Sequence, residues 1–398
     1  MGARYFPKFF IWVTGILNIV LAFATGIYYI VRKQYGGGIV FLLFGVFAVI
    51  CFISWIPRIP FTAFMLRTAM DVAKRDSRGR VFIVSALGGI VTVAFAAWFA
   101  VTLVAIYVAY EPGTSSVNPS CSDGGCSRGR VIGLVVYVTF ATYWISEWIK
   151  NTVHTTVAGI YGSWYFYAQN DDSKGTSRLP TGSTRGAFRR ATTYSFGSVS
   201  FGSLIIAFVN ALRQACSVLR RHEAGEGSIV GSIFACILSS LVALLDWLVT
   251  IFNRYAFCHI ALYGDAYIPA AKDTWKVVKD RGVDVLVNDC LMGPVLTMGA
   301  AGVAYICALL SFLYLQFTKP GYNSAAAEGE GSFTAVTMAF AFVIGLQVCH
   351  VFMTPVGSGI ETIFVAMAWN PEVLMANHPR VHQGLVKVYP KVQQAVRM

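Results

Sequence analysis

The sequence predicts an all-α protein, a polytopic membrane bundle of about eight transmembrane helices with both termini in the cytoplasm. Hydrophobic residues make up 56% of the chain and charged residues only 13%, whereas soluble proteins carry about 25% charged residues. Several apolar stretches reach the length of about 20 residues that a helix needs to cross a bilayer. Basic residues recur between these stretches, as membrane topology places them.

The apolar stretches define the predicted spans and domains. We expect one transmembrane domain over residues 1–368, followed by a basic cytoplasmic tail over 369–398. The segments are long and mostly not alternating, which favours helices over the strands of a membrane barrel. The predicted spans cover residues 9–31, 38–56, 81–110, 131–168, 192–212, 229–252, 285–317 and 333–355.

The distribution of basic residues predicts the orientation. Most of the 31 Lys and Arg residues fall in the N-terminus, in alternate connections and in the tail. Because basic residues are retained on the cytoplasmic side, these segments are predicted to be inside. The net charge of +12 is spread along the chain rather than gathered in one arm, which argues against nucleic acid as a partner. The tail mixes basic and apolar residues, so we predict that it either contacts anionic membrane lipids or is disordered.

The nine Cys residues indicate no metal site. They are scattered, without a CxxC pair or a zinc-type Cys/His spacing, so we expect no metal and no cofactor. Cys121 and Cys126 lie in a predicted outside loop, where they form either a disulfide or two free thiols. The sequence also lacks a P-loop, a GxSxG, an HExxH and a dinucleotide fingerprint, so it does not predict an enzyme.

Four polar residues interrupt the long span over 131–168, namely Glu147, Lys150, Asn151 and His154. Their spacing of three, one and three residues puts them on one side of a helix. Charges inside a membrane almost always face the bundle interior or a water-filled cavity, so we expect this polar stripe to face inward. In one interpretation Glu147 and Lys150 form an internal ion pair that holds the bundle together. In the other, the stripe lines a substrate path.

Further acids and aromatic residues extend the candidate site. Asp246 lies deep in its span. Glu361 belongs either to a continued last helix or to a short broken one, and the preceding Pro355, Gly357 and Gly359 favour the break. An organic cation is held by aromatic faces together with a nearby acid, although Trp residues also anchor helices at membrane interfaces. The candidate substrate-binding residues are Trp144, Glu147, Trp148, His154, Trp164, Asp246 and Glu361.

Several separate stretches resemble the choline transporter-like family, and its fungal Pns branch in particular. They are RATTYSFGSVSFGSLIIAFVNALRQ, NRYAFCHIALYG, GSGIETIFVAMAWNPEVL, SWIPRIPF and YWISEWIKNTVHTTVAGIYGSWYF. The resemblance implies a multi-pass plasma-membrane protein of the solute-carrier type. It matches the family's Asn-containing signature to Asn253-Arg254-Tyr255-Ala256 and its last-span acid to Glu361, whereas His154 stands where the family commonly has glutamine or an acid. The family pattern has ten spans, so we expect the cytoplasmic N-terminal segment and two leading spans of that pattern to be absent here.

Three functions remain open from the sequence. The first is a carrier or facilitator for a small organic cation, choline or similar, across the plasma membrane. The second is a non-transporting membrane scaffold or lipid-interacting protein. The third is a channel, which would need a ring of like residues from several subunits. The candidate acids and Trp residues favour the first, and an internal Glu147–Lys150 ion pair favours the second.

Overall fold

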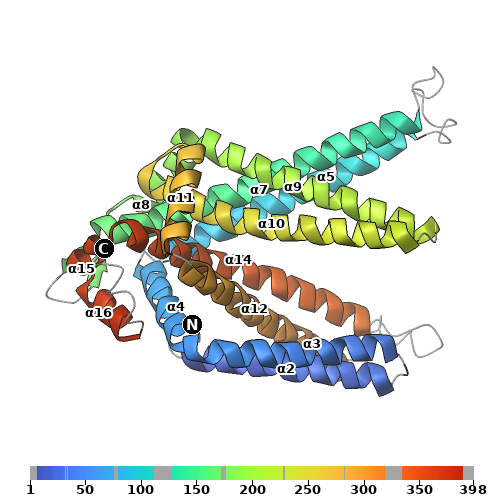
Figure 1. Ribbon diagram of the computed structural model, residues 1–398, viewed down its shortest axis with the longest axis horizontal. Coiled ribbons are helices and arrows are strands. Elements are labelled where there is room, and N and C mark those ends of the chain that lie inside the picture. The colour runs from blue at the N-terminus through green and yellow to red at the C-terminus, as the bar shows by residue number, and fades with distance from the viewer. Residues whose placement is uncertain are drawn as a thin grey trace. The chain divides into compact units, whose positions relative to one another are not determined.

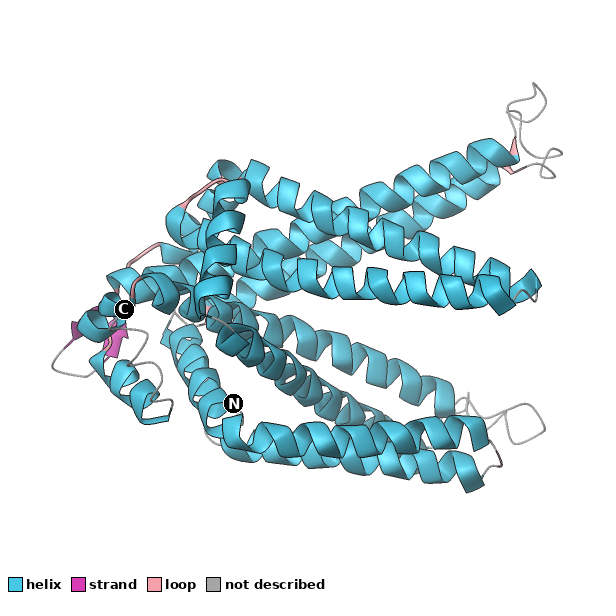
Figure 2. Cartoon of the chain, in the orientation of Figure 1, coloured by secondary structure: helices cyan, strands magenta, loops and turns pink. Residues whose placement is uncertain are grey.

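The computed structural model describes residues 7–388, except residues 32, 34, 76–78, 112–126, 172–175, 227–228, 282 and 319–333. Helices account for nearly all of the described chain (Figure 2). A small antiparallel hairpin joins β1 (Gln169–Asp171) to β2 (Thr176–Arg178), with Gln169 opposite Arg178. The all-α prediction is therefore confirmed apart from this hairpin.

Seven of the described helices are long and apolar enough to cross a membrane. An eighth span results if α3 and α4, which meet at an angle of 81°, count as one bent span. This agrees with the predicted bundle of about eight spans. The orientation of the termini stays a prediction.

Contacts divide the chain into two compact units. The first unit comprises residues 1–82, 164–179 and 278–398. Its helices are α2 (Pro7–Val31), α3 (Tyr35–Trp55), η1 (Ile56–Arg58), α4 (Ile59–Arg75), α12 (Val283–Thr318), α14 (Thr334–Trp369), α15 (Pro371–Asn377) and α16 (Pro379–Val388).

Apolar packing joins α2, α3, α4 and α12 inside the first unit. Ile11, Phe52, Ile59, Ala63 and Val295 form one buried cluster. Within this unit α12 runs along α14, and α2 runs along α3 (Figure 1). The amphipathic helix α4 buries Met65, Leu66 and Ala69 among others, and it contacts α2, α12, α14 and α16.

The helix α14 corrects the prediction of a break before Glu361. It runs without interruption from Thr334 to Trp369 and contains Pro355 in its interior. Neighbouring helices and side-chain hydroxyls let a membrane helix tolerate an internal proline, which has no N–H to donate. Thr354 donates to the carbonyl of His350 at 2.9 Å, and Thr362 donates to the carbonyl of Ser358 at 2.6 Å. Glu361 is consequently a residue of a continuous helix.

The second unit comprises residues 83–163 and 180–277. It contains most of α5 (Arg80–Tyr110) and of α7 (Arg128–Tyr167), followed by α8 (Ser183–Arg189), the π-helical turn η2 (Arg190–Tyr194), α9 (Phe196–Glu226), α10 (Ile229–Tyr263) and α11 (Tyr267–Arg281). Helices α9 and α10 pack along one another within this unit (Figure 1).

A close approach at Gly202 brings α9 against α10 and α11. A Cβ atom at this position would lie 2.6 Å from ring atoms of Phe257 and of Tyr267. Phe257 and Tyr267 belong to a buried cluster with Ile206, Ala256 and Ile260. Only a glycine leaves room for these two rings, so Gly202 fixes the distance between α9 and the helices that carry polar residues of the site.

Candidate functional site: a buried polar cluster on α7, α9, α10 and α11

The middle of α7 places neutral polar side chains inside the second unit. Asn151 and His154 are buried, with exposed fractions of 4% and 6%. Three buried threonines lie on the same part of the helix, and Thr155 and Thr156 donate to the carbonyls of Asn151 and Thr152 at 2.8 and 2.7 Å. These local hydrogen bonds satisfy the hydroxyls of Thr155 and Thr156, whereas Asn151 and His154 are directed at neighbouring helices.

Asn151 connects α7 to α9. Its Nδ2 donates a hydrogen bond to Oγ of Ser203 at 2.9 Å, and both side chains are buried. A polar group buried among membrane helices is costly without a partner. The pair therefore fixes the register between the two helices.

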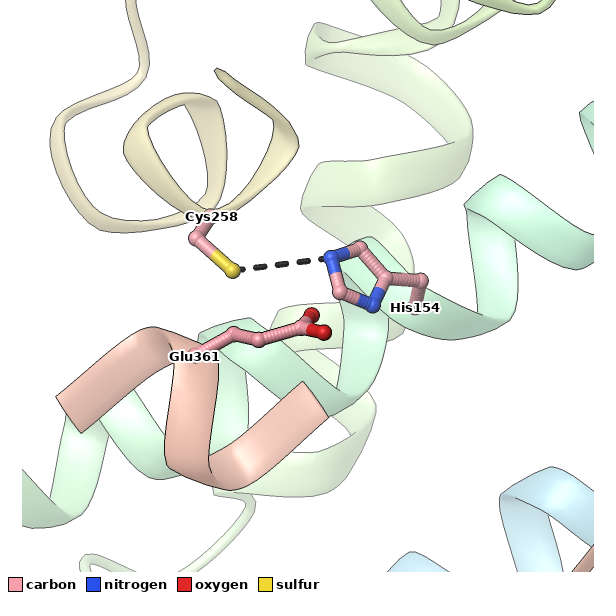
Figure 3. Close-up of side chains that lie close together, drawn as sticks. All are labelled: His154, Cys258 and Glu361. Carbon is pink, nitrogen blue, oxygen red and sulfur yellow. Dashed lines mark hydrogen bonds between the residues drawn. The ribbon is translucent and has the colours of Figure 1, made fainter. Parts of the chain in front are cut away.

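His154 connects α7 to α10. Its Nε2 lies 3.1 Å from the carbonyl oxygen of Arg254 and 3.5 Å from Sγ of Cys258 (Figure 3). Because a carbonyl oxygen only accepts, the contact with Arg254 requires a proton on Nε2. This assigns the Nε2-protonated form of His154, with the Cys258 sulfur as a weaker neighbour.

Asn253 and Tyr267 extend the cluster to α11. The Tyr267 hydroxyl donates to Oδ1 of Asn253, and Nδ2 of Asn253 makes a long contact of 3.5 Å with the Gly202 carbonyl. Burial raises the pKa of Tyr267 to about 12, and the hydrogen bond with Asn253 opposes that shift. Tyr267 is thus a neutral donor at physiological pH.

The charged half of the polar stripe is less covered. Lys150 Nζ lies 3.3 Å from a Glu147 carboxylate oxygen, and the exposed fractions of the two side chains are 62% and 15%. Trp144 Nε1 donates to the Ser200 carbonyl at 3.0 Å. The ring of Trp148 meets Phe196 edge-on at 5.5 Å. Glu147 therefore lies on α7 between two Trp residues that both contact α9.

Other predicted residues have different surroundings. Asp246 accepts from Nη1 of Arg213 at 2.9 Å, which ties α10 to α9 within the second unit. Trp164 and Glu361 belong to the first unit. Trp164 is buried and stacks on His378 with a centroid distance of 4.1 Å, and Glu361 is buried on α14. Within the second unit, Trp144 and Trp148 both contact α9, and Glu147 lies between them on α7.

The predicted Cys121–Cys126 disulfide lies outside the described residues. Ser203, Cys258 and Tyr267 were not predicted from the sequence, because single small or aromatic residues in apolar segments carry no distinctive spacing. The Asn253 signature was the one available signal for this part of the site.

Comparisons with known proteins identify the family. A family model described as a plasma-membrane choline transporter matches residues 39–372, which is most of the chain. The chain belongs to the choline transporter-like family. It is 72% identical to Protein pns1 of Aspergillus fumigatus over 397 residues, covering 100% of this chain and 72% of that protein. It is 56% identical to Protein PNS1 of Gibberella zeae, covering 99% of this chain and 70% of that one.

A more distant relative gives the same picture. Protein PNS1 of Candida albicans is 42% identical over 396 residues, covering 99% of this chain and 74% of the Candida protein. These matches confirm the resemblance to the fungal Pns branch of the choline transporter-like family. This chain is therefore a transporter-like, multi-pass membrane protein.

Proposed function

We propose that this chain is a carrier or facilitator that moves a small organic cation, choline or a close analogue, across the plasma membrane. The observation that carries the proposal is the polar stripe of α7, where Glu147 lies between Trp144 and Trp148 and is followed by the buried Asn151 and His154. Polar and ionisable residues inside a membrane are costly and mark substrate paths. In this proposal residues 369–398 form a cytoplasmic tail beside the transmembrane domain.

The chemistry of a quaternary ammonium matches these groups. Such a cation has no N–H donor, so proteins recognise it by negative charge and by aromatic faces. Glu147 supplies the charge, and the Trp144 and Trp148 rings flank it on α7. Asn151 and His154 supply hydrogen-bonding groups for a hydroxyl such as that of choline. Lys150 competes with the cation for Glu147, because it already lies 3.3 Å from that carboxylate.

A non-transporting scaffold is the second candidate, and one observation favours it. The Asn151–Ser203, His154–Arg254 and Tyr267–Asn253 contacts pair polar groups of neighbouring helices with each other. Interhelical hydrogen bonds of this kind hold membrane bundles together without any substrate. A scaffold would therefore keep these contacts and show no saturable uptake.

Uptake of radiolabelled choline into proteoliposomes tests the proposal. We expect saturable uptake by the native chain, and at least about a tenfold lower rate for Glu147→Gln, because the substitution removes the negative charge and keeps the shape. Lys150→Met is expected to retain uptake with a lower KM, since the competing cation is gone. Glu372→Gln, at an exposed acid of α15, is the matched control.

Two results would contradict the proposal. Normal uptake by correctly folded Glu147→Gln would remove this residue from the site. No uptake of choline or of related quaternary amines by the folded native chain would support the scaffold. Folding is checked independently by thermal unfolding in detergent.

A further inference from the structure

A second group of ionisable side chains lies at the corner between α10 and α11, apart from the α7 stripe and within the second unit. The helix α10 ends at Tyr263, and Gly264 follows with a φ of +81°. Its N–H donates to the Ile260 carbonyl at 2.9 Å, which closes the helix end. A glycine in the left-handed region is the usual way to turn the chain here. The turn brings Asp265 back towards His259 on the last turn of α10.

Three side chains from this corner converge. His259, Asp265 and Asp273 each offer one ligand atom, and these atoms all lie within 4.8 Å of one another. His259 is buried at 4% exposure, and its ring packs on Tyr263 at 4.7 Å, which fixes the direction of the imidazole. The carboxylates of Asp265 and Asp273 are 45% and 29% exposed. A small ion can therefore reach the two carboxylates from the surface, and the imidazole of His259 is held in a fixed orientation beside them.

The spacing of the atoms suits a metal ion. Nδ1 of His259 lies 3.5 Å from Oδ2 of Asp265, which is long for a hydrogen bond. Two ligands that each sit about 2.0–2.2 Å from a tetrahedral ion are about 3.3–3.6 Å apart. The Asp273 side chain approaches from α11 and adds a third ligand atom.

We propose that His259, Asp265 and Asp273 form a binding site for a divalent first-row transition-metal ion. One imidazole nitrogen and two carboxylate oxygens fit borderline ions such as Mn²⁺ and Zn²⁺. Three protein ligands leave at least one coordination position for water. Because the ligands come from α10, the corner and α11, a bound ion fixes the angle between these two helices.

Lys276 competes with the proposed metal ion for the carboxylate of Asp273. Its Nζ donates to Oδ1 of Asp273 at 2.8 Å, one turn along α11. This hydrogen bond is the main cause that lowers the pKa of Asp273. Asp273 is therefore ionised at neutral pH, and the positive charge of the same ammonium group opposes a metal ion at this carboxylate. The arrangement predicts that removing Lys276 strengthens the site.

Mn²⁺ binding to the purified chain, followed by electron paramagnetic resonance, tests the proposal. Mn²⁺ is used because carboxylate and imidazole ligands suit it better than the thiolates of the nine Cys residues. We expect one saturable equivalent of Mn²⁺, a nitrogen coupling from the imidazole, and displacement by Zn²⁺. Asp265→Asn and Asp273→Asn should each weaken binding at least about tenfold. His259→Gln should remove the nitrogen coupling.

Lys276→Met keeps the test decisive if a ligand variant fails to fold. We expect this substitution to raise the affinity for Mn²⁺, whereas a purely structural cluster of ion pairs would only lose stability. Glu372→Gln on α15 serves as the matched acid control and should leave binding unchanged. The proposal is wrong if neither the folded native chain nor Lys276→Met binds Mn²⁺ saturably, or if both aspartate variants bind it as the native chain does.

Discussion

The two halves of the α7 stripe both consist of polar residues, but they differ in charge and in how far the neighbouring helices cover them. Glu147 and Lys150 are charged and pair with each other, and the Lys150 side chain is 62% exposed. The other two residues, Asn151 and His154, are called the neutral half: Asn151 has no charge, His154 carries a proton on Nε2, and both are buried against α9 and α10. Burying a charge costs several kcal/mol, roughly, unless it is paired and hydrogen-bonded. The charged half is thus the less covered part of the stripe, and the neutral half joins α7 to α9 and α10.

Among the substitutions considered, a charge placed in the neutral half should reduce the stability of the protein most. Asn151→Asp puts a carboxylate opposite Ser203, where no cation is seen among the contacts of Asn151. We expect a loss of at least about 3 kcal/mol in the free energy of unfolding at neutral pH. The loss should shrink as the pH falls and the carboxyl is protonated. Denaturation in detergent at several pH values measures both effects, and a stable variant at neutral pH would contradict the division.

Removing one hydroxyl from the buried cluster beside the neutral half should have a smaller effect. Tyr267→Phe takes the donor away from Asn253, at an expected cost of about 1–2 kcal/mol. The pKa of Tyr267 is raised from 10.0 to about 12 by burial, so this residue's contribution to stability is fully present below pH 10.0 and is lost as the pH rises through about 12. Alkaline unfolding of the native chain and of Tyr267→Phe should converge over that range. If the difference in stability between the two proteins stayed constant over this pH range, the ionisation of Tyr267 would not be the cause of the alkaline loss of stability.

Removing the cation from the charged half should change stability least. Lys150→Met is expected to shift the free energy of unfolding by less than about 1 kcal/mol, because a largely exposed ion pair contributes little. Denaturation in detergent measures the free energy of unfolding of Lys150→Met, for comparison with that of Asn151→Asp. A loss as large as that of Asn151→Asp would mean that the Glu147–Lys150 pair is a buried structural element.

The sequence predicted the class of fold because the hydrophobic signal is strong and long-range contacts are not needed to read it. It also placed Asn151 and His154 on an inward face of their helix. It could not separate Lys150 from Asn151, because adjacent residues differ by about 100° around a helix and only the neighbouring helices decide which is covered. It failed at Pro355, where tertiary packing keeps α14 continuous. It likewise did not predict that Ser203 would contact Asn151 or that Tyr267 would contact Asn253, because each of these contacts joins two separate helices.

The C-terminal end of α7 depends on residues that are synthesised much later than the helix itself. The Tyr165 hydroxyl donates to the Asn370 carbonyl across 205 residues of sequence. Nδ2 of Asn377 donates to the Phe166 carbonyl at 3.1 Å across 211 residues, and Nε2 of His378 reaches the Trp164 carbonyl at 3.1 Å across 214 residues. The last carbonyls of a helix lack partners within that helix. During synthesis, therefore, α7 leaves the ribosome long before the residues that cap it. A premature stop codon just before Asn370 would spare every predicted transmembrane segment and still leave that helix end without the hydrogen bonds from Asn377 and His378.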